Sequence, residues 1–129
     1  MAATLAGSRV TGPGDLYRYR ATVVRWVDGD TAKVDVDLGV RVHWHGSLRC
    51  AGYNAPEVTG STAMAGAAAT GFVEKTCPPG TVVFIDSLAF EPGDELDHFG
   101  RMLAAVTLPD GSDLADVMIG AGHAVADPA

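Results

Sequence analysis

The sequence has little positive charge. Nine Lys and Arg residues stand against sixteen Asp and Glu residues, which gives a formal net charge of −7 over 129 residues. Proteins that hold nucleic acid mainly through phosphate contacts are usually basic, so this balance argues against tight, non-specific binding of that kind. It leaves room for an enzyme in which a few local cations or a bound metal ion hold a single phosphate.

Cysteine and long apolar runs are also scarce. Cys50 and Cys77 are too few for a disulfide framework, and neither has metal-ligand spacing, so we expect small apolar core residues in a reducing compartment. No apolar run reaches the roughly 20 residues of a membrane-spanning helix. The first residues lack the basic and then apolar order of a secretory signal. We expect a cytoplasmic monomer without membrane contact, with secretion after processing left open.

The remaining composition is that of one globular domain. Hydrophobic residues make up 47% of the chain, enough to build a core at this length. Residues 1–15 are rich in Gly, Ser, Thr and Pro and predict a flexible lead-in. Residues 16–129 are then expected to form a single domain.

Alternating hydrophobicity predicts three strands at residues 17–27, 31–38 and 40–50, joined by short turns into a meander. In the second strand, Asp35 and Asp37 would face water while the valines between them face the core. The third strand would place one apolar set on a single face: Val40, Val42, Trp44, Leu48 and Cys50.

After the third strand, the spacing of apolar residues changes from that of a strand to that of a helix. Ser61 or Thr62 is predicted to cap a helix whose apolar stripe includes Met64, Ala68 and Phe72. The Pro-Pro-Gly sequence at residues 78–80 would end it.

Two more strands and a short helix complete the pattern. Residues 81–87 form a continuous apolar run that predicts a strand buried on both faces, and a polar loop follows it. A fifth strand is expected at residues 101–108, and Asp113 would cap the last helix. This order predicts a mainly β, α+β fold: a five-stranded Greek-key barrel of the OB type with two to three packed helices.

Three short motifs stand out along this pattern. They are D-G-D-T at residues 28–31, R-x-x-G-x-N-A-P-E at residues 49–57 and F-G-R-x-L-A at residues 99–104. Taken alone, the Asp28–Gly29 pair is typical of a hairpin turn, because both residues tolerate positive φ. In this order and at these strand ends, however, the three motifs closely resemble the staphylococcal nuclease family, and the resemblance extends from about Tyr17 to Val125.

The resemblance implies a calcium site, with another divalent cation as an open alternative. Asp30 matches a carboxylate ligand, Asn54 stands where the family usually has a second aspartate, and Ala55 would lend its backbone carbonyl. Asp28 matches an acidic neighbour of the metal site with a secondary role.

The resemblance also implies the catalytic residues. Glu57 matches the general base that activates water, and Arg49 and Arg101 match two arginines that grip the phosphate. The implied function is a calcium-dependent, largely sequence-nonspecific nuclease that hydrolyses phosphodiester bonds of DNA, with RNA left open as a second substrate.

The chemistry independently suits these residue types. Guanidinium groups give planar, bidentate donors to phosphate oxygens and stay charged at any working pH. Calcium prefers carboxylate, amide and carbonyl oxygens and can polarise a phosphate. A carboxylate near a bound water is a plausible general base.

Some positions depart from the family pattern. Asn54 removes one negative charge from the metal shell. His98 and Phe99 replace a lysine and a tyrosine near the nucleotide phosphate, which should weaken binding there. The loop between the last two strands carries acids that would repel a polyanion: Glu91, Asp94, Glu95 and Asp97.

Two other interpretations stay open. The domain could be a weak or inactive OB-type module that binds nucleic acid or protein, or a structural accessory protein. Arg49 and Arg101 could equally form structural ion pairs with Asp28 and Glu57. His43 and His45 have a spacing that can bind zinc, but no third ligand is evident, so a solvent-facing pair is expected.

Overall fold

The computed structural model describes residues 17–91 and 101–127 of the chain. The predicted flexible lead-in at residues 1–15 lies outside the described residues. The same holds for His98, Phe99 and three of the loop acids: Asp94, Glu95 and Asp97.

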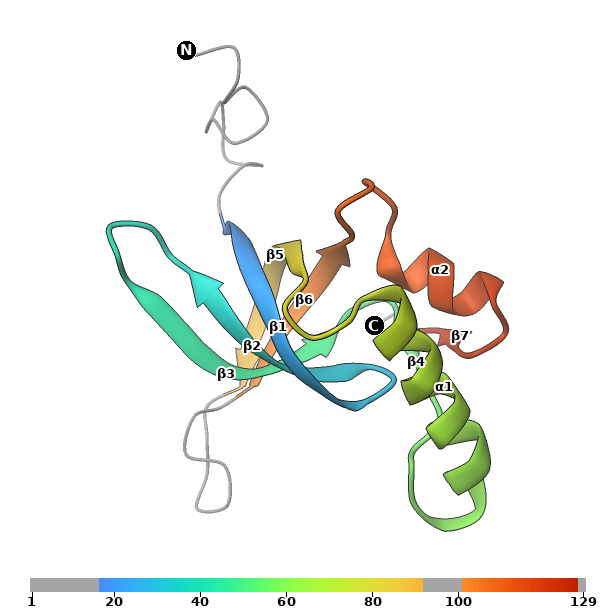
Figure 1. The fold of residues 1–129 in the computed structure, drawn as a ribbon. Helices are drawn as coiled ribbons and strands as arrows, with labels where there is room; N and C mark the ends of the chain where they lie inside the picture. Colours follow the sequence, from blue (N-terminus) through green and yellow to red (C-terminus); the bar gives the residue numbers. More distant parts are fainter. Residues whose placement is uncertain (1–16, 92–100, 128–129) are drawn as a thin grey trace.

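The centre of the fold is a closed five-stranded barrel with the order β1-β2-β3-β6-β5 (Figure 1). Its strands are β1 (Arg18–Asp28), β2 (Thr31–Asp37), β3 (His43–Cys50), β5 (Val82–Glu91) and β6 (Arg101–Thr107). Strands β3 and β6 pair in parallel, and all other neighbours in the barrel are antiparallel. The predicted five-stranded, OB-like barrel is therefore confirmed, including its opening meander.

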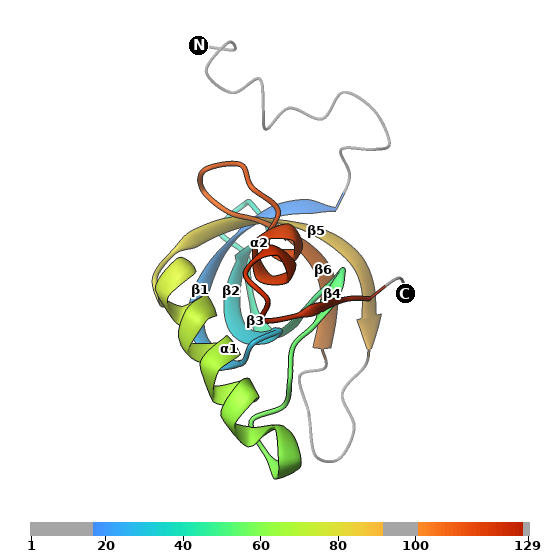
Figure 2. The same cartoon turned by 90° about the vertical axis from the view of Figure 1, so that its right-hand side faces the viewer.

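Four smaller elements and one short turn close and flank the barrel. They are β4 (Tyr53–Asn54), α1 (Ala63–Thr76) with its preceding 3-10 turn η3 (Gly60–Thr62), α2 (Leu114–Gly120) and β7 (Val125–Ala126). Strand β4 pairs with β7 in a separate two-stranded sheet. Helix α1 packs on β1 and helix α2 on β6, and Figure 2 shows α2 lying across one end of the barrel. Within residues 17–91 and 101–127, no helix is long and apolar enough to span a membrane.

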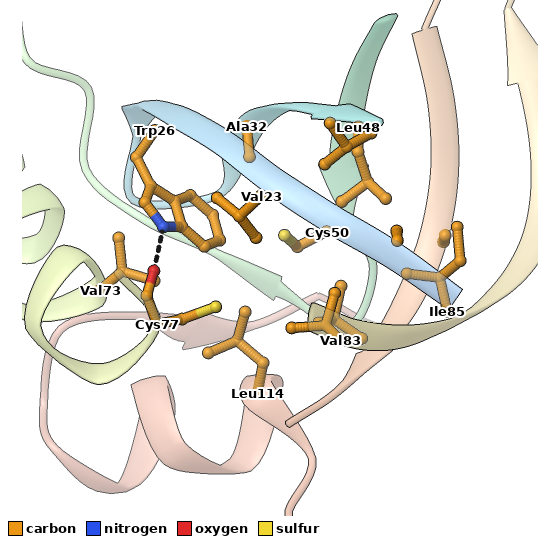
Figure 3. Packing of buried hydrophobic residues seen from close by; sticks show 14 of the residues in the cluster. Val23, Trp26, Ala32, Leu48, Cys50, Val73, Cys77, Val83, Ile85 and Leu114 are labelled. Atoms are coloured by element: carbon orange, nitrogen blue, oxygen red, sulfur yellow. Dashed lines mark hydrogen bonds between the residues drawn. The ribbon is translucent and has the colours of Figure 1, made fainter. Parts of the chain in front are cut away.

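Alternating side chains build the core. Val34 and Val36 are buried while Asp35 and Asp37 stay half-exposed on the outer face of β2, as predicted. The core continues under α1, where the Trp26 indole N–H donates to the Cys77 carbonyl at 2.8 Å (Figure 3).

Both cysteines are buried and unpaired, which confirms the prediction that they serve as small apolar core residues. Burial raises the pKa of the Cys50 thiol to about 12, so this group stays protonated and inert at neutral pH.

Helix α1 buries a different face from the predicted one. Its buried residues are Gly66, Ala69 and Val73, whereas Met64 is 90% exposed. The helix is apolar on nearly every side, so periodicity gives no clear stripe. Gly66 and Ala69 face inward, and their small size lets the helix approach the β1–β2 turn and the Glu57 backbone closely.

Two strand predictions were also wrong in detail. The third strand begins at His43, because residues 39–42 form a turn in which Val40 has φ 49° and is almost fully exposed. Strand β5 is not buried on both faces: Val83 and Ile85 point into the core, while Phe84 is half-exposed. It also extends to Glu91, into the predicted loop, because its second half pairs with β6.

Candidate functional site

The turn between β1 and β2 places Asp30 at one end of the barrel, beside the end of β3. Thr31 and Arg49 are partners in the β2–β3 register. The backbone N–H of Cys50 donates to the Asp30 carbonyl at 2.8 Å. The first two motifs, about twenty residues apart in the sequence, therefore meet in space.

Gly29 permits a close approach at this turn. A Cβ atom on Gly29 would lie 2.7 Å from the Ala55 Cβ and 3.1 Å from the Ala69 Cβ. Its φ is not in the positive region, so the usual hairpin explanation for an Asp-Gly pair is wrong here. The glycine is required because the turn, the segment after β4 and helix α1 touch at this point.

Tyr53 holds the β1–β2 turn in place through a hydrogen bond from the core. Its side chain is fully buried, and its hydroxyl donates to the Gly29 carbonyl at 2.8 Å. A buried hydroxyl without a partner would cost about 1–3 kcal/mol, so this bond ties β4 firmly to the turn.

The Asp30 carboxylate is engaged on both oxygens. Oδ2 lies 2.7 Å from Arg49 Nη1 and accepts the Ala55 backbone N–H at 2.9 Å. Oδ1 accepts the Thr31 hydroxyl at 3.2 Å. Asp28 supports the turn itself, because its carboxylate accepts the backbone N–H of Asp30 at 3.1 Å.

Arg49 joins this carboxylate to four other groups. Nη1 also donates to the Tyr53 carbonyl at 3.2 Å and to the Cys50 carbonyl at 3.5 Å, and Nη2 donates to Asn54 Oδ1. The Asp127 carboxylate lies 4.0 Å from Nη2. The side chains of Arg49 and Asp30 are only 18% and 12% exposed, so this is a largely buried ion pair and not a surface contact.

Burial raises the pKa of the Asp30 carboxyl, and the neighbouring Asp28 carboxylate acts in the same direction. The Ala55 N–H and the Arg49 guanidinium oppose this shift because they favour the ionised form. Asp30 therefore depends on these two partners to carry its charge inside the protein.

Two oxygens predicted as metal ligands do converge. Asp30 Oδ2 and Asn54 Oδ1 both contact the guanidinium of Arg49, so a single cationic group bridges them. Hard oxygen donors of this kind fit calcium. Ala55 donates its backbone N–H to Asp30 Oδ2, so the contact between these two residues is not made by the carbonyl that the resemblance implies as a ligand. Within the described part of the chain, His, Cys, Asp and Glu alone form no group of three that could hold a metal ion.

The other two catalytic candidates lie around this centre. Glu57 is exposed in the coil after β4, and its carbonyl accepts the Thr62 hydroxyl at 2.9 Å. Among the described residues, no hydrogen bond or ion pair joins its side chain to Asp30 or Arg49. Arg101 is the first residue of β6 and pairs with Ser47 of β3. Ser47 precedes Arg49 by two residues on the same strand, so the side chains of Arg49 and Arg101 both lie on the outer face of the barrel.

The His43–His45 pair is solvent-facing, as predicted. His43 Nδ1 lies 2.7 Å from Asp35 Oδ1 and His45 Nε2 lies 3.8 Å from the same oxygen, with both imidazoles exposed. These residues belong to the far part of β3 and take no part in the Asp30 network.

Sequence reasoning missed two contributors to the site. Asp127 reaches Arg49 only because β7 pairs with β4, and a two-residue strand gives no periodic signal. Gly66 lies against the backbone of Glu57: a Cβ there would be 2.1 Å from the Glu57 carbonyl oxygen. A glycine inside a predicted helix was the available signal, since such a residue usually has a packing reason.

Comparison of the chain with protein-family models and with curated proteins finds no match. The resemblance to the nuclease family therefore rests on the three sequence motifs.

The two glycines of α1 give a matched test of this packing. Gly71→Ala should stabilise the protein by about 0.5–1 kcal/mol, because its Cβ meets nothing within 4 Å and alanine favours a helix. Gly66→Ala should destabilise it in spite of the same propensity gain, because the Glu57 backbone has to move. Urea denaturation measures both. Equal stabilisation by the two substitutions would contradict the close contact of α1 with Glu57.

Proposed function

We propose that the chain is a calcium-dependent nuclease that hydrolyses phosphodiester bonds of DNA with little sequence specificity, with RNA as an open second substrate. The observation that supports this most directly is the convergence of Asp30, Asn54 and Arg49 at one end of the barrel. The Asp30 and Asn54 oxygens could bind a hard cation, and the Arg49 guanidinium beside them could bind a phosphate.

The roles follow from the chemistry of each group. Calcium held by Asp30, Asn54 and a backbone carbonyl would supply a Lewis acid and a template for a phosphate oxygen. Arg101 and Arg49 would bind the other phosphate oxygens through charge-assisted hydrogen bonds. In the absence of a ligand, Arg49 presents Nη1 to Asp30 Oδ2 and Nη2 to Asn54 Oδ1, and it would exchange these acceptors for phosphate oxygens on binding substrate.

Glu57 is proposed as the general base. Its carboxylate would take a proton from a water whose oxygen forms the new bond to phosphorus. The bond from phosphorus to the departing sugar oxygen breaks on the opposite side, and that oxygen takes up a proton. The exposed position of Glu57 leaves it accessible to water and substrate, while Thr62 and Gly66 hold its backbone.

A binding module without catalysis is the second candidate. It is favoured by the self-contained hydrogen bonding of the centre, in which Arg49, Ala55 and Thr31 already occupy the oxygens of Asp30. Against it, two of the aromatic residues that could stack on bases are buried, Trp26 and Tyr53.

Cleavage with and without metal separates these candidates. The protein should cut DNA in millimolar calcium and stop when the ion is chelated. Glu57→Gln should lower the rate by about two to four powers of ten, the usual contribution of a general base, while the fold is kept. Glu74→Gln, an exposed acid on α1, serves as the matched control and should cut like the parent. A Glu57→Gln protein as active as the parent would remove Glu57 from the mechanism.

Asn54 gives a sharper test of the metal site. Its amide oxygen can bind calcium but carries no formal charge, and calcium affinity depends on the charge of the ligands. Asn54→Asp should tighten calcium binding and lower the calcium concentration for half-maximal cleavage. Calorimetric titration of both proteins measures the affinity directly. Equal or weaker binding by the Asp variant would show that residue 54 is not a ligand.

A further inference from the structure

A row of polar side chains crosses three strands next to the candidate site. Lys33 of β2 is the register partner of Ser47 on β3, and Ser47 is the partner of Arg101 on β6. These strands are neighbours around the barrel (Figure 2). Arg49 lies two residues beyond Ser47 on the same outer face, about 6.7 Å along the strand. Three cationic side chains therefore lie on one face of a protein whose net charge is −7, and one of them, Arg49, is ion-paired with Asp30.

Lys33 has a defined position in this row. Its Nζ donates to the Ser47 hydroxyl at 2.6 Å, and Ser47 is itself buried. An ammonium group has three N–H donors. Among the described residues, Ser47 is the only partner recorded for Lys33, so the lysine is held in place and keeps donors for a ligand.

A cleft opens beside Lys33 on the outer face. It has a volume of about 310 Å³ and is lined by Val24, Lys33, Val34, His45 and Gly46. Val24 stands at a bulge of β1 and is half-exposed, so it forms an apolar wall. Gly46 has no side chain because the ring of Trp44 takes up the space inside: a Cβ there would lie 2.4 Å from the indole. The cleft thus combines an apolar surface with a cation and an imidazole.

A further carboxylate, that of Asp35, ends the row of cations beyond Lys33. Asp35 follows Lys33 on the outer face of β2, and its Oδ1 lies 3.8 Å from His45 Nε2 and 2.7 Å from His43 Nδ1. A phosphate would be attracted between Arg101 and Lys33 and repelled beyond Lys33. The ligand that suits this surface therefore has a second anionic group next to the phosphate that is cleaved. It also has an apolar or aromatic part that enters the cleft.

We infer that Lys33 and this cleft form a subsite for the nucleotide that neighbours the scissile phosphate. Lys33 binds the adjacent phosphate, and the cleft between Val24 and His45 receives the sugar and base. The substrate class is then a polynucleotide chain and not an isolated phosphate ester. This inference rests on the proposed function, because it takes the cleaved phosphate to lie at Arg49 and Arg101.

The two lysines of the chain give a matched experiment. Lys33→Gln, Lys33→Arg and Lys75→Gln, the last on the exposed side of α1, are compared on two substrates in calcium. One substrate is a single-stranded oligothymidylate of about eight nucleotides, within the site size of OB-type domains. The other is bis(p-nitrophenyl) phosphate, which has only one phosphate.

Lys33→Gln should lower kcat/KM for the oligothymidylate about tenfold more than for the small diester, as expected for the loss of one charge-assisted hydrogen bond. Lys33→Arg should restore most of the difference, and Lys75→Gln should behave like the parent. An equal loss on both substrates, or the same loss in Lys75→Gln, would overturn the subsite.

A measurement of oligothymidylate binding tests the subsite even if the protein has no nuclease activity. If the parent protein hydrolyses neither substrate, the nuclease proposal fails. The subsite is then decided by fluorescence anisotropy with the labelled oligothymidylate, measured over a range of salt concentrations. Lys33→Gln should reduce the slope of log affinity against log salt by about 0.7, the value for one phosphate contact on a single strand. An unchanged slope would overturn the subsite.

Discussion

The ion pair between Arg49 and Asp30 is the interaction on which the rest of the site depends. Both side chains are largely withdrawn from water, with Nη1 and Oδ2 2.7 Å apart. A charge in such a place is tolerated only when it is paired and hydrogen-bonded. Nη1 of Arg49 also donates to the Tyr53 carbonyl, and Nη2 donates to the Asn54 amide oxygen. One guanidinium thus holds the β1–β2 turn, the end of β3 and strand β4 together.

This arrangement unites structure and proposed chemistry in the same residues. The groups that would bind a cation and a phosphate also stabilise the fold when no ligand is bound. Ligand binding would therefore compete with internal contacts: Asp30 and Asn54 now share Arg49, and each would have to exchange it for another partner. The helix α1 adds a second constraint, because Gly66 and Ala69 press it against Glu57 and Gly29.

The barrel could be predicted from the sequence because alternation in β2 and the short turns around it leave few other arrangements. The meeting of Asp30, Arg49 and Asn54 could be predicted only through the motifs, since no periodic signal joins a turn to a distant strand. The inward face of α1 could not be predicted, because a helix that is apolar on most sides has no clear stripe and the contacts of Gly66 and Ala69 depend on tertiary packing. Asp127 was hidden for a related reason: its position depends on β7, which is two residues long.

The central claim, that the Arg49–Asp30 pair organises the site, is tested most directly by a double-mutant cycle. The free energies of unfolding of the parent, Arg49→Met, Asp30→Asn and the double variant would be measured in urea with a chelator. We expect a coupling free energy of about 2 kcal/mol, typical of a strongly interacting pair. We expect it to fall in saturating calcium, where Asp30 would exchange Arg49 for the ion. Single effects that add to within about 0.5 kcal/mol in the chelator would contradict the account.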